Sequence, residues 1–363
     1  MRLGFIGVGL RGRGQALRVA RDFAHRARVV ALADVDGDNL ARARSELGAH
    51  APAVYDDWRD LVGRGDLDGV CISTPQFAHR DPTVAAFEAG LHVYCEKPLA
   101  LSLSACDDMI AAGKRAGKVL MVGQQMRYHL HLNRMRRLIH EGRIGAPHLA
   151  WLKEFRNPFP ATMKWAFDRS RSGGAIVEKS CHHFDVFTWM LGARPVRVYA
   201  SGGQAVHGEI FGVRSDVVDH AWVTVEHEGG RRAMLGLCFF AGAPHQREGG
   251  AGTHVRDIGV IGSGGMITTE GFALGRDLEL RFSESEEVER VALNPARGDP
   301  ADPLARDGNS GIWVDFLNCV ETGAEPVATG AVGREALAVA LAAERSIETG
   351  APVGVGEVDH LET

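Results

Sequence analysis

The chain has 363 residues, 45% of them hydrophobic, and a nearly balanced formal charge of −5. This length allows two domains with large cores, and the balanced charge argues against nucleic acid or an anionic membrane surface as a partner. Six scattered cysteines with no CxxC pair indicate free thiols in a reducing cytoplasm, and no apolar run approaches the roughly 18 residues of a membrane span.

The first elements in the chain are a strand, a glycine turn and a helix within residues 2–20. The strand is expected over residues 3–6, which leaves no room for a signal peptide. Gly7, Gly9 and Gly12 follow with the spacing GxGxxG, and Leu10 and Arg11 lie between them. In a strand–turn–helix this spacing allows a tight turn, approach of a pyrophosphate to the backbone, and close packing of helix on strand. The alternative is a glycine-rich surface loop, and the next strand favours the nucleotide-binding interpretation.

That second strand, expected over residues 28–33, ends in Asp34, about 20 residues beyond the glycine motif. A carboxylate at this place can accept hydrogen bonds from the ribose 2′-hydroxyl of NAD, and it would repel the extra phosphate of NADP. The sequence therefore predicts NAD as the cofactor. Arg11 and Arg13 in the glycine loop could weaken this preference.

Strands and helices then alternate as far as residue 123. Helices are expected over residues 40–47, 57–62, 83–89 and 104–116, with strands over 69–73, 91–96 and 119–123. This alternation predicts a doubly wound parallel sheet, a Rossmann domain over residues 1–123.

Two turns in this domain carry polar residues at strand ends. Ser73, Thr74 and Pro75 follow one buried strand, with His79 shortly after them, and Glu96, Lys97 and Pro98 end the next. Ligands of open α/β sheets lie outside the carboxyl ends of the strands, so Lys97 is a candidate to meet the reacting end of a cofactor. The alternative is a surface lysine in an ordinary turn.

The glycine turn, the Ser-Thr-Pro turn with His79, and above all the run Cys95-Glu96-Lys97-Pro98-Leu99 resemble the glucose-fructose oxidoreductase, inositol dehydrogenase and rhizopine-catabolism (Gfo/Idh/MocA) family. The resemblance covers nearly the whole chain. It implies that Lys97 reaches both nicotinamide and substrate, and that the bond before Pro98 is often cis. With the residue-based analysis it predicts this cofactor-binding set: Gly7, Gly9, Leu10, Arg11, Gly12, Asp34, Ser73, Thr74, Pro75, His79, Glu96 and Lys97.

Residues 124–363 differ in character and predict an α+β domain. A basic helix is expected over residues 133–141, followed by strands over 148–155, 196–202, 221–228, 231–239, 255–262 and 278–282. Such a run suggests a large, mostly antiparallel sheet. The resemblance implies that this open-faced sheet pairs subunits in a homo-oligomer, a dimer or tetramer. A late helix, residues 333–349, is expected to pack back on the first domain.

A second group of polar residues lies on a helix expected over residues 175–191. Glu178, His182 and Asp185 are spaced i, i+4 and i+7, which places them on one α-helical face, whereas His183 points about 100° away. A carboxylate one turn from an imidazole can orient the ring for proton transfer. By itself the pattern favours a solvent-facing polar stripe. Many family members carry Asp at the position of Glu178 and His at the position of His182. The resemblance therefore makes Lys97, His182 and Glu178 the catalytic candidates.

Other roles remain open for this segment. Glu178 and His182 could begin a zinc site, but the spacing offers no third ligand, and no metal is expected. The basic loop with Lys164, Arg169 and Arg171, joined by Lys179, could bind an anionic sugar group, with a solvated loop as the alternative. The candidate substrate-binding residues are Arg127, Tyr128, Lys164, Trp165, Lys179, His183 and Asp185.

The main hypothesis is an NAD-dependent enzyme that moves a hydride between nicotinamide and a hydroxyl-bearing carbon of a sugar, inositol or related polyol. Lys97 would polarise the reacting oxygen and His182 would exchange its proton. A second hypothesis is a glycoside hydrolase that uses NAD transiently, through oxidation, elimination, water addition and re-reduction. A third is a protein that senses NAD without turnover, against which the presence of Lys97 and His182 argues.

Overall fold

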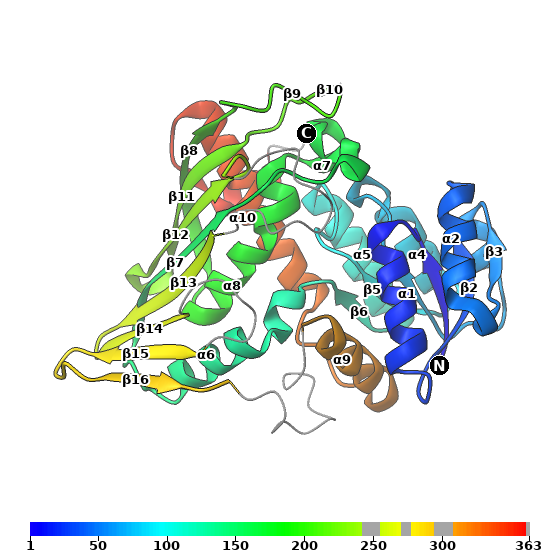
Figure 1. Cartoon of the computed structure of the whole chain (residues 1–363), viewed down its shortest axis with the longest axis horizontal. Coiled ribbons are helices and arrows are strands. Elements are labelled where there is room, and N and C mark those ends of the chain that lie inside the picture. Colours follow the sequence, from blue (N-terminus) through cyan, green and yellow to red (C-terminus); the bar gives the residue numbers. More distant parts are fainter. Residues whose placement is uncertain (242–254, 270–276, 294–307, 361–363) are drawn as a thin grey trace. The chain divides into compact units, whose positions relative to one another are not determined.

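The computed structural model describes residues 1–241, 255–269, 277–293 and 308–360. Contacts divide the chain into two units (Figure 1). Unit 1 comprises Met1–Gln125 and Pro300–Arg334, and unit 2 comprises Met126–Asp299 and Glu335–Thr363. The expected boundary followed residue 123, and the expected late helix was placed on the first domain. That helix, α10 (Gly330–Thr349), begins in unit 1 and from Glu335 onward belongs to unit 2.

The sheet of unit 1 is parallel throughout, with the strand order β3-β2-β1-β4-β5-β6 among the described residues. This is the doubly wound order whose direction reverses between β1 and β4, where ligands bind in such folds. The strands are β1 (Arg2–Ile6), β2 (Arg28–Ala33), β3 (Ala53–Tyr55), β4 (Gly69–Ile72), β5 (His92–Cys95) and β6 (Leu120–Val122). Every residue of β4 is buried, as expected for a strand covered on both faces.

Helices connect these strands and follow the sequence rules for helix ends. In α5, Ser102 caps the first turn through its hydroxyl, which accepts from the Ala105 N–H, and Gly117 ends the helix in the left-handed conformation. The helices of unit 1 are α1 (Leu10–Asp22), α2 (Gly37–Leu47), α3 (Trp58–Val62), α4 (Arg80–Glu88), α5 (Leu103–Ala116) and α9 (Gly308–Thr322). The sequence-based prediction did not include α9.

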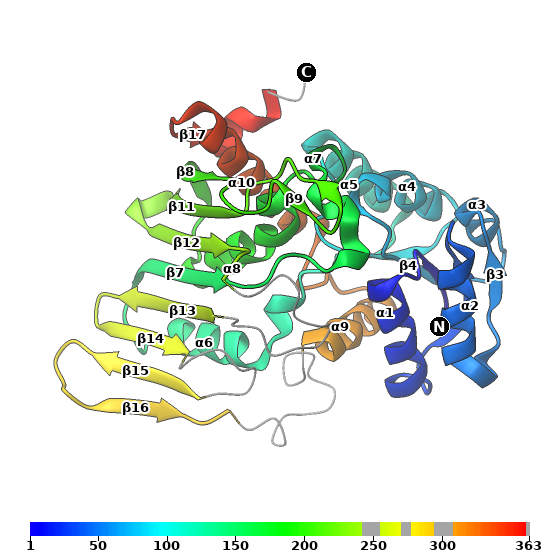
Figure 2. The ribbon, with the colours of Figure 1, turned by 45° about the horizontal axis from the view of Figure 1, so that its top comes forward.

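Unit 2 is built on a mixed, mostly antiparallel sheet with the order β16-β15-β14-β13-β7-β12-β11-β8-β17 in the described chain (Figure 2). Among the described strands of this sheet, only β7 and β12 pair in parallel. The strands are β7 (Pro147–Phe155), β8 (Pro195–Gly203), β11 (His220–His227), β12 (Arg232–Cys238), β13 (Val255–Gly262), β14 (Gly265–Thr269), β15 (Leu278–Phe282), β16 (Val288–Val291) and β17 (Val353–Gly354). A separate ribbon pairs β9 (Glu209–Ile210) with β10 (Val213–Arg214). The predicted fold class is confirmed in both units.

Helices cover one face of this sheet (Figure 2). They are α6 (Leu130–His140), α8 (Cys181–Leu191) and the later part of α10, and α8 packs against β7. The short helix α7 (Arg169–Ser172) instead packs against the 3-10 segment Ala161–Phe167. Along β11 the side chains alternate between buried and more exposed positions, so one sheet face carries the core and the other is open. No described helix is long and apolar enough to cross a membrane.

Candidate active site

The glycine turn of unit 1 is shaped by close contacts. Gly7 has φ +80°, and a Cβ there would lie 2.6 Å from the Thr74 backbone nitrogen; at Gly12 it would lie 1.8 Å from the Gly7 carbonyl oxygen. Both positions therefore require glycine. At Gly9 the nearest atom to such a Cβ is Asn39 Nδ2, 3.7 Å away. This glycine leaves open space at the start of α1.

The amino-terminal turn of α1 is suited to an anion. No side chain among the described residues caps it at Gly9, and its first turn carries no acidic residue. The first N–H groups of a helix lack intrahelical partners and attract phosphate. The loop thus fits the pyrophosphate of a dinucleotide, with the neighbouring residue Leu10 largely exposed.

Asp34 follows β2, and its carboxylate lies against the glycine turn. Its Oδ2 accepts from the Val8 N–H at 2.7 Å, and its Oδ1 accepts from the Asp36 N–H at 2.9 Å. Arg11 and Arg13, which might have offset its charge, pair with other carboxylates, Glu96 and Glu46. Asp34 is therefore placed to favour a free ribose hydroxyl over a phosphate.

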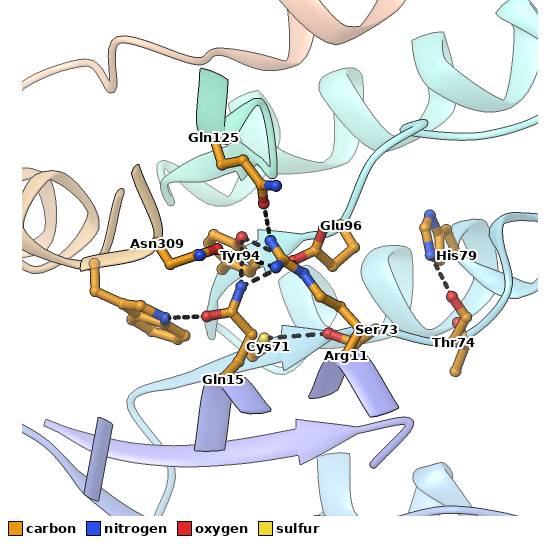
Figure 3. A network of polar contacts seen from close by, with 11 residues as sticks. Arg11, Gln15, Cys71, Ser73, Thr74, His79, Tyr94, Glu96, Gln125 and Asn309 are labelled. Atoms are coloured by element: carbon orange, nitrogen blue, oxygen red, sulfur yellow. Dashed lines mark hydrogen bonds and ion pairs between the residues drawn. The ribbon is translucent and has the colours of Figure 1, made fainter. Parts of the chain in front are cut away.

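A buried network joins the glycine loop to the Glu-Lys-Pro turn (Figure 3). Glu96 Oε1 accepts from Arg11 Nε at 2.7 Å, Gln15 Nε2 at 2.9 Å and the Tyr94 hydroxyl at 3.0 Å. Burial alone would raise the pKa of the Glu96 carboxyl, but Arg11 and the other donors hold it below its ordinary value. Its side chain also fills the space beside Gly123, where a Cβ would lie 2.7 Å from Glu96 Oε2.

The same network reaches the late helix α9 in unit 1. The Arg11 guanidinium also donates to Asn309 Oδ1 at 3.0 Å and to Gln125 Oε1, and Gln15 Oε1 accepts from the Trp313 indole N–H at 2.7 Å. The Trp313 ring stacks on Tyr94, with ring centroids 5.1 Å apart. Arg11, predicted as a cofactor contact, thus directs its charge into the protein interior, as Figure 3 shows.

Lys97 follows β5 directly, and its bond to Pro98 is cis. The lysine is partly exposed, whereas Glu96 and Pro98 on either side are buried. His79 joins the two turns of this edge: its Nε2 lies 2.8 Å from the Thr74 carbonyl oxygen, and its Nδ1 lies 3.0 Å from that of Pro98. His79 is fully enclosed and supports the turns that carry Ser73, Thr74, Pro75 and Lys97.

In unit 2, the segment with Glu178 and His182 differs from the expected helix. Residues Ile176–Ser180 form a π-helix, and α8 begins only at Cys181. A π-helix closes i→i+5 hydrogen bonds, so the i, i+4 spacing of an α-helix does not hold across Glu178 and His182. Both side chains are buried, and π-turns within helices are frequent at functional sites.

Arg127 and Asp185, two predicted substrate contacts, are bound to each other. Arg127 Nε lies 2.9 Å from Asp185 Oδ2, and its Nη2 lies 2.6 Å from Oδ1. The guanidinium carbon of Arg127 is 5.5 Å from the Trp189 ring centroid. This buried pair links the turn before α6 to α8. A substrate that bound Arg127 or Asp185 would therefore bind a side chain that is already paired with the other.

The remaining predicted substrate residues occupy different environments. Tyr128 is fully buried, whereas Lys164 is exposed and Trp165 half-buried in the 3-10 segment Ala161–Phe167. Lys179 and His183 both bind Glu154 of β7, at 2.8 and 2.9 Å. The sequence-based prediction missed Glu154, because one glutamate within an alternating strand carries no local signal. Among the described residues no group of three or more His, Cys, Asp or Glu could hold a metal ion.

The strand order, the glycine turn and Asp34 are those of a dinucleotide-binding domain. Residues 1–124 match the model of the Gfo/Idh/MocA oxidoreductase family with an NAD-binding Rossmann fold, and residues 132–268 match its C-terminal domain. The chain belongs to the Gfo/Idh/MocA family of NAD-dependent oxidoreductases.

Individual relatives match over most of their length. The chain is 28% identical to a myo-inositol 2-dehydrogenase of Thermotoga maritima over 99% of both chains. It is also 28% identical to a 2,7-anhydro-N-acetylneuraminate hydratase of Mediterraneibacter gnavus over 88% of both. The crystal structure of a probable dehydrogenase from Thermotoga maritima superposes with a TM-score of 0.77 at 25% identity, covering 98% of this chain and 100% of that one.

Proposed function

We propose that the protein transfers a hydride between NAD and a hydroxyl-bearing carbon of a sugar, inositol or related polyol. The observation that carries this proposal is the turn after β5, where Lys97 is partly exposed between buried neighbours at the edge that the glycine turn also occupies. Similarity to a myo-inositol 2-dehydrogenase along the full chain supports it.

Each candidate residue has a distinct role in this proposal. NAD, when bound, would supply the hydride acceptor. Gly9, the start of α1 and Asp34 hold the dinucleotide, and the Lys97 ammonium polarises the substrate oxygen. His182 accepts the hydroxyl proton as the carbonyl forms, and Glu178 orients the imidazole. The carbon thereby loses a hydride and its oxygen loses a proton, a balanced two-electron oxidation.

A second candidate reaction is redox-neutral. The relative named as a 2,7-anhydro-N-acetylneuraminate hydratase supports it. Oxidation of one hydroxyl acidifies the neighbouring C–H, so a leaving group can depart, water can add, and the hydride can return to the same sugar. Lys97 and His182 would serve both routes.

One experiment distinguishes the two reactions. The NAD-loaded protein is given polyols, free sugars, glycosides and anhydro-sugars, while NADH absorbance and product formation are followed together. Dehydrogenation gives one NADH per substrate consumed. Many turnovers with no net NADH would replace it by the redox-neutral reaction, and no turnover of any compound would contradict both.

We also propose that two copies of the chain associate through the open face of the unit 2 sheet. Large apolar side chains project from neighbouring strands there: Leu149 is 45% exposed, Tyr199 48%, Trp222 54% and Met234 51%. Their registers place them on one face, because Met234 pairs with Thr224 and Thr224 pairs with Tyr199. Such a patch on a sheet is typical of a protein interface.

A further inference from the structure

Glu154, on the helix-covered face of β7, has no exposed side-chain surface and is surrounded by basic groups. The Lys179 ammonium lies 2.8 Å from its Oε1, and His183 Nε2 lies 2.9 Å from its Oε2. Arg256 Nε approaches Oε2 at 3.2 Å, and an Arg156 guanidinium nitrogen lies 3.5 Å from Oε1. These four basic residues around Glu154 are called the Glu154 cluster below.

The charges of the Glu154 cluster are unequal. Burial lowers the pKa of His183 to about 4, so its ring is neutral and donates one N–H to Glu154. Lys179, Arg156 and Arg256 are cations. Burial is the main reason that the pKa of Lys179 falls to about 8; Glu154 opposes the decrease, and the two arginines add to it. A buried site is destabilised when it holds more cations than carboxylates to pair with them.

The other face of the same strands shows the ordinary arrangement. Lys153 and Asp257, each one residue away from Glu154 and Arg256, form a single pair at 2.8 Å, with about a third of each side chain exposed. Neighbouring residues of a strand point to opposite faces, so this pair lies on the open side of the sheet. One cation per carboxylate is therefore sufficient to join β7 and β13.

Exposure within the Glu154 cluster shows which groups a ligand can meet. Glu154 is completely covered, whereas Lys179 keeps 14% of its side chain exposed, Arg156 23% and Arg256 27%. Solvent therefore reaches part of each of the three cations but not the carboxylate of Glu154. The cluster also adjoins the proposed catalytic segment, since Lys179 follows Glu178 directly and Glu178 acts electrostatically on Arg156.

We propose that Lys179, Arg156 and Arg256 form a subsite that binds the carboxylate of the substrate, so that the protein acts on a sugar acid. This proposal rests on the proposed carbohydrate function and specifies its substrate class. Two guanidinium groups and an ammonium offer charge-assisted hydrogen bonds, including bidentate ones, to a carboxylate. Among the described residues, three cations surround Glu154 and only Arg156 is also acted on by Glu178, so the charge of a bound carboxylate would balance the excess of cations.

Calorimetry on the NAD-loaded protein tests the subsite directly. Each carboxylate probe, D-glucuronate, D-galacturonate, D-gluconate and N-acetylneuraminate, is compared with its primary amide, which has nearly the same shape without the charge. We expect at least one acid to bind at least tenfold more tightly than its amide. If no acid binds more tightly than its amide, the proposal is wrong.

Variants locate that preference. Lys179→Met and Arg256→Gln are expected to reduce the acid-over-amide ratio at least tenfold, whereas Lys153→Met, a matched loss of one lysine on the opposite sheet face, should leave it unchanged. Thermal unfolding, NAD affinity and molecular mass of each variant show that it is folded and assembled as the parent protein is. A ratio that survives in both cluster variants would place the carboxylate elsewhere and overturn the proposal.

Proton uptake gives a readout that needs no variant. With a pKa of about 8, Lys179 is about half protonated at pH 8, and a bound carboxylate beside it favours the charged form. Binding should therefore take up as much as about half a proton, measured in two buffers of different ionisation enthalpy. If sugar acids bind but no hydride is transferred, the proposed function is wrong and the carboxylate subsite stands. If neutral sugars are oxidised and acids are not preferred, the proposed function stands and the subsite is wrong.

Discussion

Arg11 Nε lies 2.7 Å from Glu96 Oε1, so the loop expected to hold the dinucleotide is tied to the residue that precedes Lys97. The pair also determines which charges are available to the cofactor. Because Arg11 pairs with Glu96, its charge does not offset that of Asp34, the residue proposed to hold the ribose. Cofactor preference and the position of the lysine turn therefore depend on the same arginine.

Replacing Arg11 by Met should destabilise the protein by about 2–3 kcal/mol. The substitution leaves the Glu96 carboxylate buried with one donor fewer, which costs about 3–5 kcal/mol for a fully buried pair; the 39% exposure of the Arg11 side chain reduces this. Arg13→Met is the matched control in the same loop, because its partner Glu46 is 41% exposed at 3.4 Å. Equal losses in urea unfolding for the two variants would contradict the prediction.

NAD should bind at least tenfold more tightly than NADP, because Asp34 accepts a ribose hydroxyl and repels a phosphate. Asp34→Asn keeps an acceptor for the Val8 N–H while removing the charge, so it should narrow the difference between the cofactors without unfolding the turn. Calorimetric titration with both cofactors measures this ratio. Equal or tighter NADP binding by the parent protein would show that Asp34 does not select the cofactor.

Lys97→Ala should abolish most turnover and leave NAD affinity within about threefold, because the ammonium acts on the reacting oxygen and a lost polar interaction in the transition state costs 10²-fold or more. Once the screen has found a substrate, steady-state kinetics and NAD titration of this variant provide the check. Full turnover would reduce the lysine to a structural role.

The two neighbouring histidines should differ in what they affect. His182→Asn is expected to lower turnover by about 10²–10⁴-fold with little change in unfolding temperature, as for a general base. His183→Ala should instead destabilise unit 2 by about 2–4 kcal/mol, because it leaves a cavity and deprives Glu154 of a donor. If His183→Ala instead lost turnover and His182→Asn lost stability, in steady-state kinetics and thermal unfolding, the roles of the two histidines would be exchanged.

The contribution of Glu344 to stability should fall as pH rises from about 5 to 8. Burial raises the pKa of this carboxyl from 4.5 to about 7. An acid with a raised folded pKa stabilises the fold fully below its unfolded pKa, and this contribution, about 2–3 kcal/mol, is lost as pH rises through 7. Glu344 accepts from the Ile176 N–H at 3.3 Å, at the start of the π-helix.

Glu344→Gln should therefore remove this falling contribution, so that the free energy of unfolding of the variant rises relative to that of the parent protein between pH 5 and 8, as urea unfolding at several pH values would show. Glu348→Gln is the control on the same helix. The pKa of Glu348 is lowered, so its contribution is lost only in the acid range, and the control should keep the parent slope between pH 5 and 8. A parent slope that persists in Glu344→Gln would exclude Glu344 as its source.

Trp222→Arg should shift the protein toward the monomer, because it places a charge in the apolar face proposed to join two copies. Light scattering over a range of concentrations measures the mass. Glu88→Gln, at an exposed position of α4 in unit 1, raises the net charge by the same amount and controls for that change. A monomeric parent protein would contradict the proposed association.

Much of the fold could be predicted because its signals are local. The glycine spacing, the buried strands and the proline after Lys97 each act within a few residues, and the expected strands over residues 255–262 and 278–282 coincide with β13 and β15. The prediction missed β14 and β16, which are short and pair with β15 on its two sides. Their stability depends on that pairing more than on their own sequences.

The contacts that shape the candidate sites are not local. Trp313 meets Gln15 across 298 positions, and Lys179 meets a glutamate on β7, so no pattern within one segment could reveal either contact. The π-helix is a further example, because the 3.6-residue period was applied to a segment with a wider turn. Sequence spacing identified Glu178, His182 and Lys97 as candidates but not their surroundings.

The return of residues 308–334 to unit 1 has a consequence for synthesis of the chain. Asn309 and Trp313, which complete the surroundings of Arg11 and Gln15, leave the ribosome roughly 15–60 s after their partners at about 5–20 residues per second. During that interval Tyr94 lacks the ring that stacks on it. Nascent chains stalled before α9 should therefore be cleaved readily by protease in the nucleotide-binding half, and those stalled after it should resist.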